Sequence, residues 1–207
     1  MRKEETIKHE TILEVASRRF SHFGIDKTTV TEIAEDLGIS KQSLFYYYHD
    51  KNSLIKAVVE KIINEFEVAT TRLFQTAPSL EAALLGMIEL KRSFFKQYQL
   101  MAVPGNKRDL NNLKPALTGL YNNARKTTCS LISEMIKKGI QTNELECADP
   151  EETSELIIEM FTAFEHCNAQ QNKVPDEQQF DQLFDKQKQV LKLIVNGLKT
   201  KHETTNA

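Results

Sequence analysis

The stretch "TTVTEIAEDLGISKQSLFYYYHDKNSL" (28–54) decides how the first part of the chain folds. Thr29 is followed three residues later by Glu32, a spacing that is typical of a capping box and marks the start of a helix. Gly38 then supplies a residue that tolerates a positive φ in a tight turn. Ser40 can cap a short second helix after that turn. Two helices separated by a four-residue turn match a helix-turn-helix.

Helical periodicity continues on both sides of this stretch. Before it, a helix is predicted to run to about Phe23, where Gly24 suits its C-terminal end. After it, Asp50 can cap a helix from about Lys51 to Ala77, which contains no glycine or proline. At 1.5 Å per residue, this helix would be about 40 Å long.

The rest of the chain is also predicted to be helical. Further helices are expected from Pro78 to about Met101, from the end of a loop at 103–115 to about Gly139, over 151–171 and over 177–200. Glycine and proline are scarce, at 7 and 5 residues, and no strand-like alternation competes with the helical period. The predicted fold is therefore all-α: an N-terminal three-helix helix-turn-helix domain (1–50) is joined by a long helix to a larger helical domain (51–207).

Composition narrows the function classes. The chain has 207 residues, of which 40% are hydrophobic and 27% are charged, so it can form a real core. No apolar run approaches the roughly 20 residues of a membrane span. The N-terminus "MRKEETIKHE" also lacks the apolar stretch of a signal peptide. We therefore expect a cytoplasmic protein with no membrane partner. The net charge of −2 gives no support to nucleic-acid binding, so a prediction of such binding depends on the pattern of residues in the sequence.

The chemistry-bearing residues form no catalytic motif. Cys129, Cys147 and Cys167 are far apart and form no CxxC, which favours three reduced thiols, with a redox-sensing thiol as the alternative. His166 and Cys167 are adjacent on a predicted helix and therefore diverge. The sequence contains no phosphate loop, paired-histidine metal spacing or nucleophile elbow. We predict no catalytic residues, no metal site, no cofactor and no enzymatic activity.

Residues 12–54 resemble the DNA-binding domain of the tetracycline-repressor (TetR) family of bacterial transcription regulators. The matching positions are Ile12, Ala16, Phe20, Gly24, Thr28, Thr29, Val30, Ile33, Ala34, Gly38, Ser40, Lys41, Leu44, Tyr47, Lys51 and Leu54. The match covers about a quarter of the chain, and the remainder is similar to the family in organisation only. The resemblance implies a sequence-specific transcriptional regulator whose partner is double-stranded operator DNA.

The chain departs from the family pattern at three places. Lys8 and His9 stand where the family often has Thr-Arg, which puts a backbone contact from an arginine in doubt. Gln42 replaces a frequent glycine in the recognition helix, and "FYYY" (45–48) replaces the usual Tyr-His-Tyr-Phe. Each change falls where operator choice or domain packing would be tuned.

Helical spacing divides the four adjacent aromatic residues between the core and the DNA. Leu44 and Tyr48 share a face, and the resemblance implies that this face points to the core. Tyr48 then needs a partner for its hydroxyl, because an unpaired buried hydroxyl is costly. Phe45 lies beside that face and is expected to pack. Tyr46 and Tyr47 lie on sides that can face the DNA.

Side-chain chemistry gives the candidate DNA contacts their roles. Gln42 carries a donor and an acceptor that can bridge adenine N6 and N7, and Lys41 can reach guanine O6 and N7 or a phosphate. The candidate DNA-binding residues are Thr28, Thr29, Ser40, Lys41, Gln42, Ser43, Tyr46, Tyr47 and Lys51. Alternatives remain open: Thr29 and Ser40 can act only as caps, the lysines can be solvated, and Tyr47 can pack on the first helix.

The resemblance also implies a homodimer, because one helix-turn-helix reads few base pairs and half-sites lie about 34 Å apart. The last two helices are the expected interface, unless their apolar stripes pack only within the monomer. The candidate interface residues are Leu156, Met160, Phe180, Leu183, Phe184, Leu191, Ile194 and Leu198.

Finally, the resemblance implies that the larger domain binds an unidentified small-molecule effector, although no motif marks the pocket. The candidate ligand-binding residues are Met87, Lys91, Phe94, Tyr98, Tyr121, Arg125, Phe164 and Cys167. The alternative is that they belong to the core or to the solvated surface, with Lys91 extending to solvent. Their aromatic character favours a mostly apolar molecule that releases a repressor from its operator. The alternative is a helical ligand-binding or interaction protein whose helix-turn-helix is only architectural. The near-neutral charge of residues 1–55 favours this alternative slightly.

Overall fold

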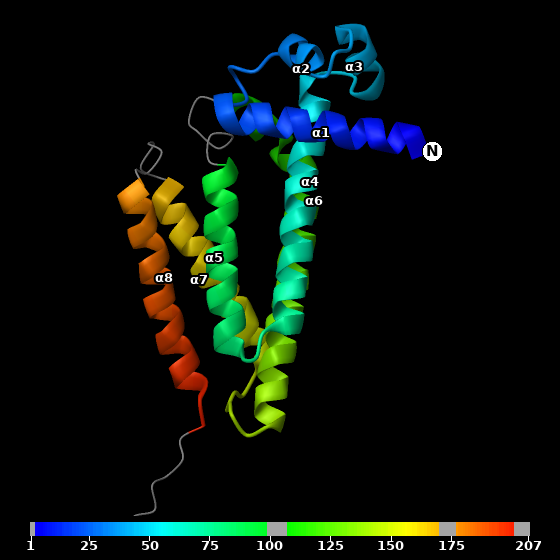
Figure 1. The fold of residues 1–207 in the computed structure, drawn as a ribbon. Coiled ribbons are helices and arrows are strands. Elements are labelled where there is room, and N and C mark those ends of the chain that lie inside the picture. Colours follow the sequence, from blue (N-terminus) through cyan, green and yellow to red (C-terminus); the bar gives the residue numbers. More distant parts are fainter. Residues whose placement is uncertain (1–2, 99–106, 170–176, 201–207) are drawn as a thin grey trace, which may run out of the picture. The chain divides into compact units, whose positions relative to one another are not determined.

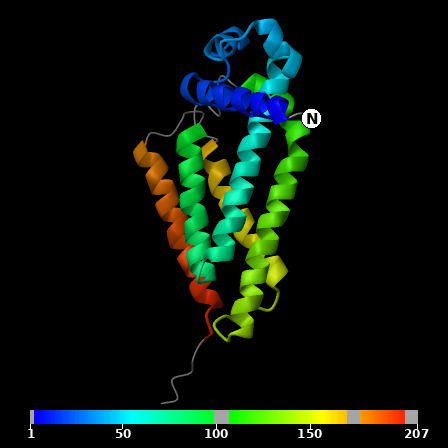
Figure 2. The ribbon, with the colours of Figure 1, turned by 45° about the vertical axis from the view of Figure 1, so that its right-hand side comes forward.

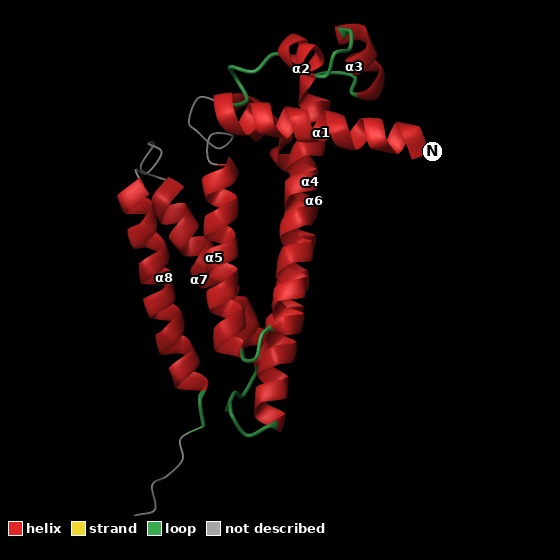
Figure 3. Cartoon of the chain, viewed as in Figure 1, coloured by secondary structure: helices red, strands yellow, loops and turns green. Residues whose placement is uncertain are grey.

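The structure, a computed structural model, describes residues 3–98, 107–169 and 177–200, and most of these lie in helices (Figure 1, Figure 3). The helices are α1 (Lys3–Phe23), α2 (Val30–Asp36), α3 (Lys41–Tyr47), α4 (Lys51–Thr76), α5 (Leu80–Tyr98), α6 (Lys107–Gln141), α7 (Pro150–Ala169) and α8 (Glu177–Leu198). Within the described ranges, the one β-type pairing is an isolated bridge between Leu145 and Lys199. The prediction of an all-α fold with an N-terminal helix-turn-helix is confirmed. No helix in this part of the chain is long and apolar enough to cross a membrane.

The chain divides into two compact units, and each combines segments that are distant in the sequence. The first contains Met1–Phe66 and Phe94–Asn122, and the second contains Glu67–Ser93 and Asn123–Ala207. Helices α4, α5 and α6 each contribute residues to both units, because each helix crosses one of these limits. The predicted domain division between residues 50 and 51 stays a prediction.

In the first unit, α1, α2 and α3 pack around an apolar core, and α1 runs across the first turns of α4 (Figure 1, Figure 2). The large side chains buried in this unit include Phe20, Ile25, Ile33, Leu44 and Ile55. Complete burial of one such side chain contributes about 1.5–3 kcal/mol. The core therefore holds α2 and α3, which have seven residues each and are too short to be stable alone, against α1.

A bidentate ion pair joins α1 to α2. Arg19 donates from Nε to Asp36 Oδ2 at 2.6 Å and from Nη2 to Asp36 Oδ1 at 2.7 Å. These hydrogen bonds lower the pKa of the Asp36 carboxyl. Because two parallel hydrogen bonds fix orientation as well as distance, the pair sets how the end of α2 lies against α1.

The predicted capping box of α2 is confirmed. The backbone N–H of Glu32 donates to Thr29 Oγ1 at 3.2 Å, and the backbone N–H of Thr29 donates to Glu32 Oε2 at 2.7 Å. This hydrogen bond from Thr29 is the main reason that the pKa of Glu32 is lowered. Two backbone donors that would otherwise lack partners are satisfied reciprocally.

The other predicted turn and cap residues have the expected geometry. Gly38 has a φ of +64°, the left-handed conformation that glycine adopts at little cost. Ser40 Oγ accepts a hydrogen bond from the Ser43 N–H at 3.0 Å, which caps α3. Asp50 Oδ1 accepts one from the Ser53 N–H at 2.7 Å, which caps α4. The start of each helix around the turn is therefore fixed by local side chains.

In the second unit, α8 lies beside α5 (Figure 1, Figure 2) and packs against α7. Ion pairs between Arg92 and Asp181 and between Lys188 and Glu89 join α5 to α8. The buried apolar side chains of this unit include Met87, Ile88, Ile132, Ile136, Ile157, Phe161, Leu191 and Val195. The core of the unit therefore draws on all four of its helices that follow α4.

The prediction of a loop at 103–115 is wrong for residues 107–115, which belong to α6. The earlier part of that stretch lies outside the described residues. Pro115 lies inside the helix, although an internal proline removes one hydrogen bond and costs about 3 kcal/mol. No other glycine or proline occurs from Lys107 to Thr118, so the segments on both sides of Pro115 can remain helical. The predicted connection at 172–176 also lies outside the described residues.

The capping box yields a first test of local stability. We expect Thr29→Ala to lower the free energy of unfolding by about 1 kcal/mol, because the N–H of Glu32 loses its acceptor. Urea denaturation followed by circular dichroism measures the change. Thr31→Ala is the matched control, since Thr31 is exposed on the same helix. An equal loss of stability in both variants would show that Thr29 makes no special contribution.

A close contact at the end of α6 yields a second test. A Cβ at Gly139 would lie 2.5 Å from Leu145 Cδ1 and 2.6 Å from Leu145 Cγ, so Leu145 would have to move. We expect Gly139→Ala to lower the free energy of unfolding by about 1–3 kcal/mol in urea denaturation. At Gly197 no atom lies within 4 Å of the added Cβ, so Gly197→Ala should raise it by about 0.5–1 kcal/mol. Stabilisation of both variants would contradict the tight packing at Gly139.

Candidate nucleic-acid interface

The short helix α3 presents its polar residues outward because one side chain holds it to the core. Leu44 is fully buried, and it is the one buried side chain of α3, all of whose residues the structure describes. Lys41, Gln42 and Ser43, which form the first turn of α3, are exposed. Three adjacent polar side chains on the first turn of a helix form a surface that can enter a groove of DNA.

Tyr46 is the most exposed aromatic residue of this helix, with 81% of its surface accessible. Its ring meets the ring of Tyr47 edge to face, with centroids 5.4 Å apart. A tyrosine this exposed leaves both its ring and its hydroxyl available to a partner molecule. Tyr46 is therefore on the surface, and its contact with DNA stays a prediction.

A hollow of about 510 Å³ lies between α1 and the turn-and-helix segment that follows α2. Its lining residues are Lys8, Thr11, Ile12, Leu37, Ile39, Ser43, Tyr46 and Tyr47. Three of the predicted DNA-binding residues, Ser43, Tyr46 and Tyr47, come together here. Lys8 and Thr11 also line the hollow but were not predicted as DNA contacts. The sequence signal for them was their position close to His9, where the chain differs from the family pattern. An ammonium and hydroxyl groups around one hollow are typical phosphate ligands.

His9 on α1 contacts the last two tyrosines of the aromatic run. The ring centroids of His9 and Tyr47 are 5.0 Å apart, and those of His9 and Tyr48 are 5.6 Å apart. The Nδ1 atom of His9 lies 3.3 Å from the Tyr48 hydroxyl, within hydrogen-bond distance. Tyr48 is half-buried, and burial, followed by the charge of Glu60, raises the pKa of its hydroxyl. The predicted need of Tyr48 for a polar partner is met by a residue that itself departs from the family pattern.

The prediction that Phe45 packs inward is wrong. Phe45 is 37% exposed, and the Nζ atom of Lys41 lies 5.5 Å from the centre of its ring. Residues four apart share a helix face, so the Lys41 ammonium can approach the face of the ring. Since α3 has only seven residues, Leu44 alone reaches the core and its neighbour Phe45 is turned to the surface.

Thr28 has a structural position. Its side chain is buried, and its hydroxyl donates to the carbonyl oxygen of Gly24 at 2.8 Å. A buried hydroxyl whose hydrogen is already donated is not available to a phosphate. We therefore leave Thr28 out of the DNA surface proposed below.

The other predicted contacts near the helix starts are accessible. Thr29 and Ser40 are exposed, and each also caps its helix. The hydroxyls of Ser40 and Ser43 lie 2.8 Å apart. Lys51 is partly exposed at the first position of α4. Because capping uses the oxygen of Thr29 and Ser40, any phosphate contact from them depends on their remaining hydrogen-bonding capacity.

The predicted ligand-binding residues divide between the two compact units. In the first unit, the Phe94 ring lies 5.3 Å from the Phe66 ring and 5.9 Å from the Tyr98 ring, centre to centre. Tyr121, also in this unit, is exposed. The ligand role of these residues stays a prediction.

In the second unit, Met87 is fully buried and Phe164 is partly buried. The Nζ atom of Lys91 lies 5.2 Å from the centre of the Phe161 ring. Arg125 pairs with Glu159 at 3.3 Å. Lys91 and Arg125 therefore have partners within the chain, and the side chain of the remaining candidate, Cys167, lies outside the description.

The predicted interface residues also fall into two groups. Phe184 and Leu191 are buried within the second unit, whereas Leu156 is 58% exposed. The partly buried members are Met160, Leu183, Ile194 and Leu198. The side chain of Phe180 lies outside the description. Leu193, which is 72% exposed, was missed because it falls outside the predicted stripe of α8.

Comparison with known proteins places the first part of the chain in a family. Residues 12–58 match the family model described as bacterial regulatory proteins, tetR family. The transcriptional regulator RutR of Escherichia coli K12 is 34% identical over 91 residues, which are 44% of this chain and 42% of RutR. The alignment thus spans less than half of RutR. The uncharacterised regulator YhgD of Bacillus subtilis is 20% identical over 75% of this chain and 81% of its own length.

Solved structures share the fold over nearly the whole chain. A transcriptional regulator from Cytophaga hutchinsonii superposes with a TM-score of 0.82 at 24% identity, over 93% of this chain and 99% of that chain. A TetR transcription regulator from Haloarcula marismortui gives 0.70 at 14% identity, over 94% and 100%. At these identities the likeness concerns the fold alone. The family model therefore assigns residues 12–58 to the tetR family of bacterial regulatory proteins, and the remainder of the chain has the same helical fold as these solved structures.

Proposed function

We propose that the chain is a dimeric, sequence-specific DNA-binding transcriptional regulator, and that it acts as a repressor released by a small-molecule effector. The observation that carries the proposal is the exposed polar face of α3, held outward by the burial of Leu44. An exposed recognition helix preceded by a capped helix and a glycine turn is the arrangement that reads the major groove. No enzymatic step is part of the proposal.

The DNA contacts divide into base readout and backbone positioning. Gln42 is the proposed reader of a base edge, because its amide can bond adenine N6 and N7 together. Tyr46 adds contact to a thymine methyl or a phosphate from the same exposed face. Lys41 and Lys51 position the backbone at the two ends of the footprint. The remaining proposed contacts are Thr29, Ser40, Ser43 and Tyr47.

Dimerisation is proposed through α7 and α8. Leu156 and Leu193 are large apolar residues with more than half of their surface accessible in the single chain. Burial of such side chains against a second copy removes apolar surface from water. Two copies would present two recognition helices to half-sites about 34 Å apart, or a multiple of that distance.

Release by an effector is proposed to act through α4. This helix runs for 26 residues without a glycine or proline, and it begins at Lys51 next to the recognition helix. An effector can shift DNA affinity only if it binds the two conformations differently. The coupling is reciprocal, so operator DNA should weaken effector binding by the same factor.

Substitution of Gln42 and of Lys51 tests the docking. Gln42→Ala should change the order of preferred sequences in a selection from random duplex DNA, because a base contact is lost. Lys51→Ala should weaken all sequences alike and reduce the slope of log affinity against log salt by about 1. Lys138→Ala is the control, since Lys138 is exposed on α6 and lies outside the proposed surface.

Two outcomes would contradict the proposal. Unchanged operator affinity in both variants would show that α3 does not dock as described. Failure of the full chain to retard DNA from its own promoter region at low salt would favour the architectural alternative. The near-neutral charge of residues 1–55 makes the low-salt condition the more sensitive one.

The dimer is tested by sedimentation of the full chain. We expect a dimer at micromolar concentration for the wild type, and a Kd at least about tenfold weaker for Leu156→Glu, because a charge would be buried at the interface. Val68→Glu is the matched control, since Val68 is 70% exposed in the second unit and outside the proposed interface. A monomeric wild type would remove the dimer from the proposal.

A further inference from the structure

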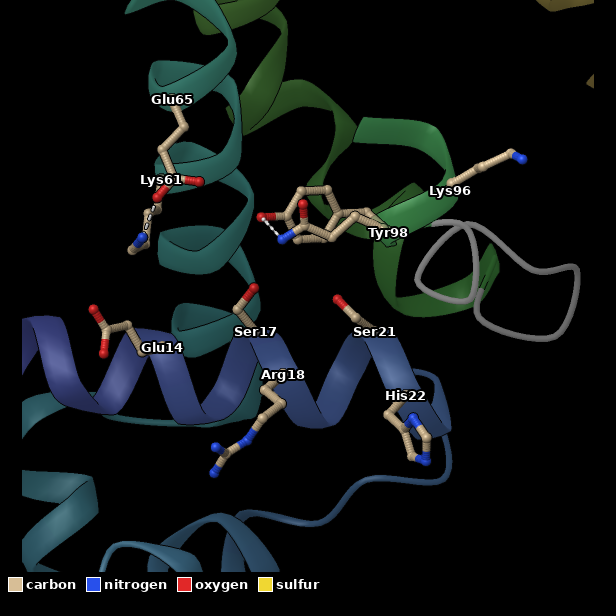
Figure 4. Close-up of a pocket in the computed structure, with 10 residues that line it drawn as sticks. Glu14, Ser17, Arg18, Ser21, His22, Lys61, Glu65, Lys96 and Tyr98 are labelled. Carbon is tan, nitrogen blue, oxygen red and sulfur yellow. Dashed lines mark hydrogen bonds and ion pairs between the residues drawn. The ribbon is translucent and has the colours of Figure 1, made fainter. Parts of the chain in front are cut away.

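A polar pocket in the first unit has no role in the proposed DNA surface. It has a volume of about 550 Å³, within the roughly 300–1,000 Å³ of small-molecule sites. The lining residues are Glu14, Ser17, Arg18, Ser21 and His22 of α1, Lys61 and Glu65 of α4, and Lys96, Gln97 and Tyr98 of α5 (Figure 4). All ten belong to one compact unit.

The floor of this pocket consists of hydroxyl groups. Ser17 and Ser21 are four residues apart on α1, and both point toward Tyr98 (Figure 4). The Tyr98 hydroxyl accepts a hydrogen bond from Gln97 Nε2 at 2.9 Å. Burial, followed by the negative charge of Glu65, raises the pKa of Tyr98, and Ser17 and Glu65 also interact with its hydroxyl. Three hydroxyls on one side suit a partner that both donates and accepts hydrogen bonds.

One of these hydroxyls lacks a partner among the described residues. The Oγ atom of Ser21 is buried, and no hydrogen-bond partner for it is found among the described residues. A buried polar group left unpaired costs about 1–3 kcal/mol. A molecule in the pocket that offers a donor or acceptor to Ser21 would recover this cost.

The charges at one end of the pocket favour a cation. Lys61 pairs with Glu65, and Glu14 extends from α1 toward the same side (Figure 4). The charge of Glu14 also acts on Lys61, so two carboxylates surround one ammonium. This leaves one negative charge uncompensated among these three groups. An additional cation at this end would be attracted to the exposed Glu14 carboxylate and to the partly exposed Glu65.

Arg18, His22 and Lys96 also line the pocket. Arg18 and His22 leave α1 on the side opposite to Ser17 and Ser21, and Lys96 points away from the hydroxyl groups (Figure 4). In this view the ends of these three side chains point away from the hydroxyl groups, whereas Ser17, Ser21 and Glu14 point toward the space between the helices.

We propose that this pocket binds a small polar molecule that carries several hydroxyl groups and one protonated amine, as an amino sugar does. The amine lies at the end formed by Glu14, Lys61 and Glu65. The hydroxyl groups of the ligand bond Ser17, Ser21 and Tyr98. The mostly apolar effector expected from the sequence would not match this polar lining.

A ligand in this pocket would touch both α1 and α4. Helix α1 carries Lys8 and Thr11 beside the recognition helix, and α4 begins at Lys51. Occupancy would therefore alter DNA affinity, a consequence that rests on the proposed function. Ligand binding does not require DNA and is measured without it. An absence of ligand binding can therefore be distinguished from an absence of DNA binding.

The test titrates the full chain with three matched probes by isothermal calorimetry. Glucosamine carries hydroxyls and an ammonium, glucose carries hydroxyls alone, and glucuronate carries hydroxyls and a carboxylate. We expect glucosamine to bind with a Kd of about 1 mM or tighter, glucose about tenfold more weakly, and glucuronate most weakly. Absence of glucosamine binding at this concentration, or equal binding of all three sugars, would overturn the proposal.

Single substitutions test whether the sugars bind in this pocket and whether the amine lies at the Glu14 end. Glu14→Gln should weaken glucosamine about five- to tenfold and leave glucose unchanged, because only the charge interaction is lost. Glu10→Gln, which removes an exposed carboxylate outside the pocket lining, should change neither. Ser21→Leu should fill the pocket and abolish binding of both sugars. Glucosamine binding that survives Glu14→Gln unchanged would sink the proposal even if Ser21→Leu fails to fold.

Discussion

The burial of Leu44 is the interaction on which the DNA surface depends. A helix of seven residues is too short to be stable in water on its own, so α3 persists because one side chain anchors it and Ser40 caps it. The same anchor fixes the rotation of the helix about its axis. Once Leu44 points inward, Gln42, Ser43 and Tyr46 must point elsewhere, and the available direction is solvent.

Helix α1 supplies the second constraint, because it contacts both helices of the motif. Arg19 holds the end of α2 through two parallel hydrogen bonds, and His9 contacts the tyrosines at the end of α3. The two contacts lie at separate places along α1. The helix-turn-helix is therefore held to α1 at two places, beside its turn and at the end of α3.

Local chemistry explains what could be predicted from the sequence. The caps at Thr29, Ser40 and Asp50 involve residues three apart, so spacing alone identifies them. Phe45 was misplaced because seven residues cannot bury two adjacent large side chains, which depends on how much of α3 the core can cover. Thr28 looked like an exposed hydroxyl, and only the folded chain shows its bond to Gly24. Pockets lined by three helices have no signal in sequence spacing at all.

The contact between His9 and Tyr48 joins two positions that are 39 residues apart. Each differs from the residue that is usual in the family, and each supplies the polar partner that the other requires. A phenylalanine at 48 would leave the His9 Nδ1 atom without this partner, and a different side chain at 9 would leave the Tyr48 hydroxyl half-buried without one. Substitutions at these two positions are therefore coupled. A change at either one should be tolerated best when the other residue is changed at the same time.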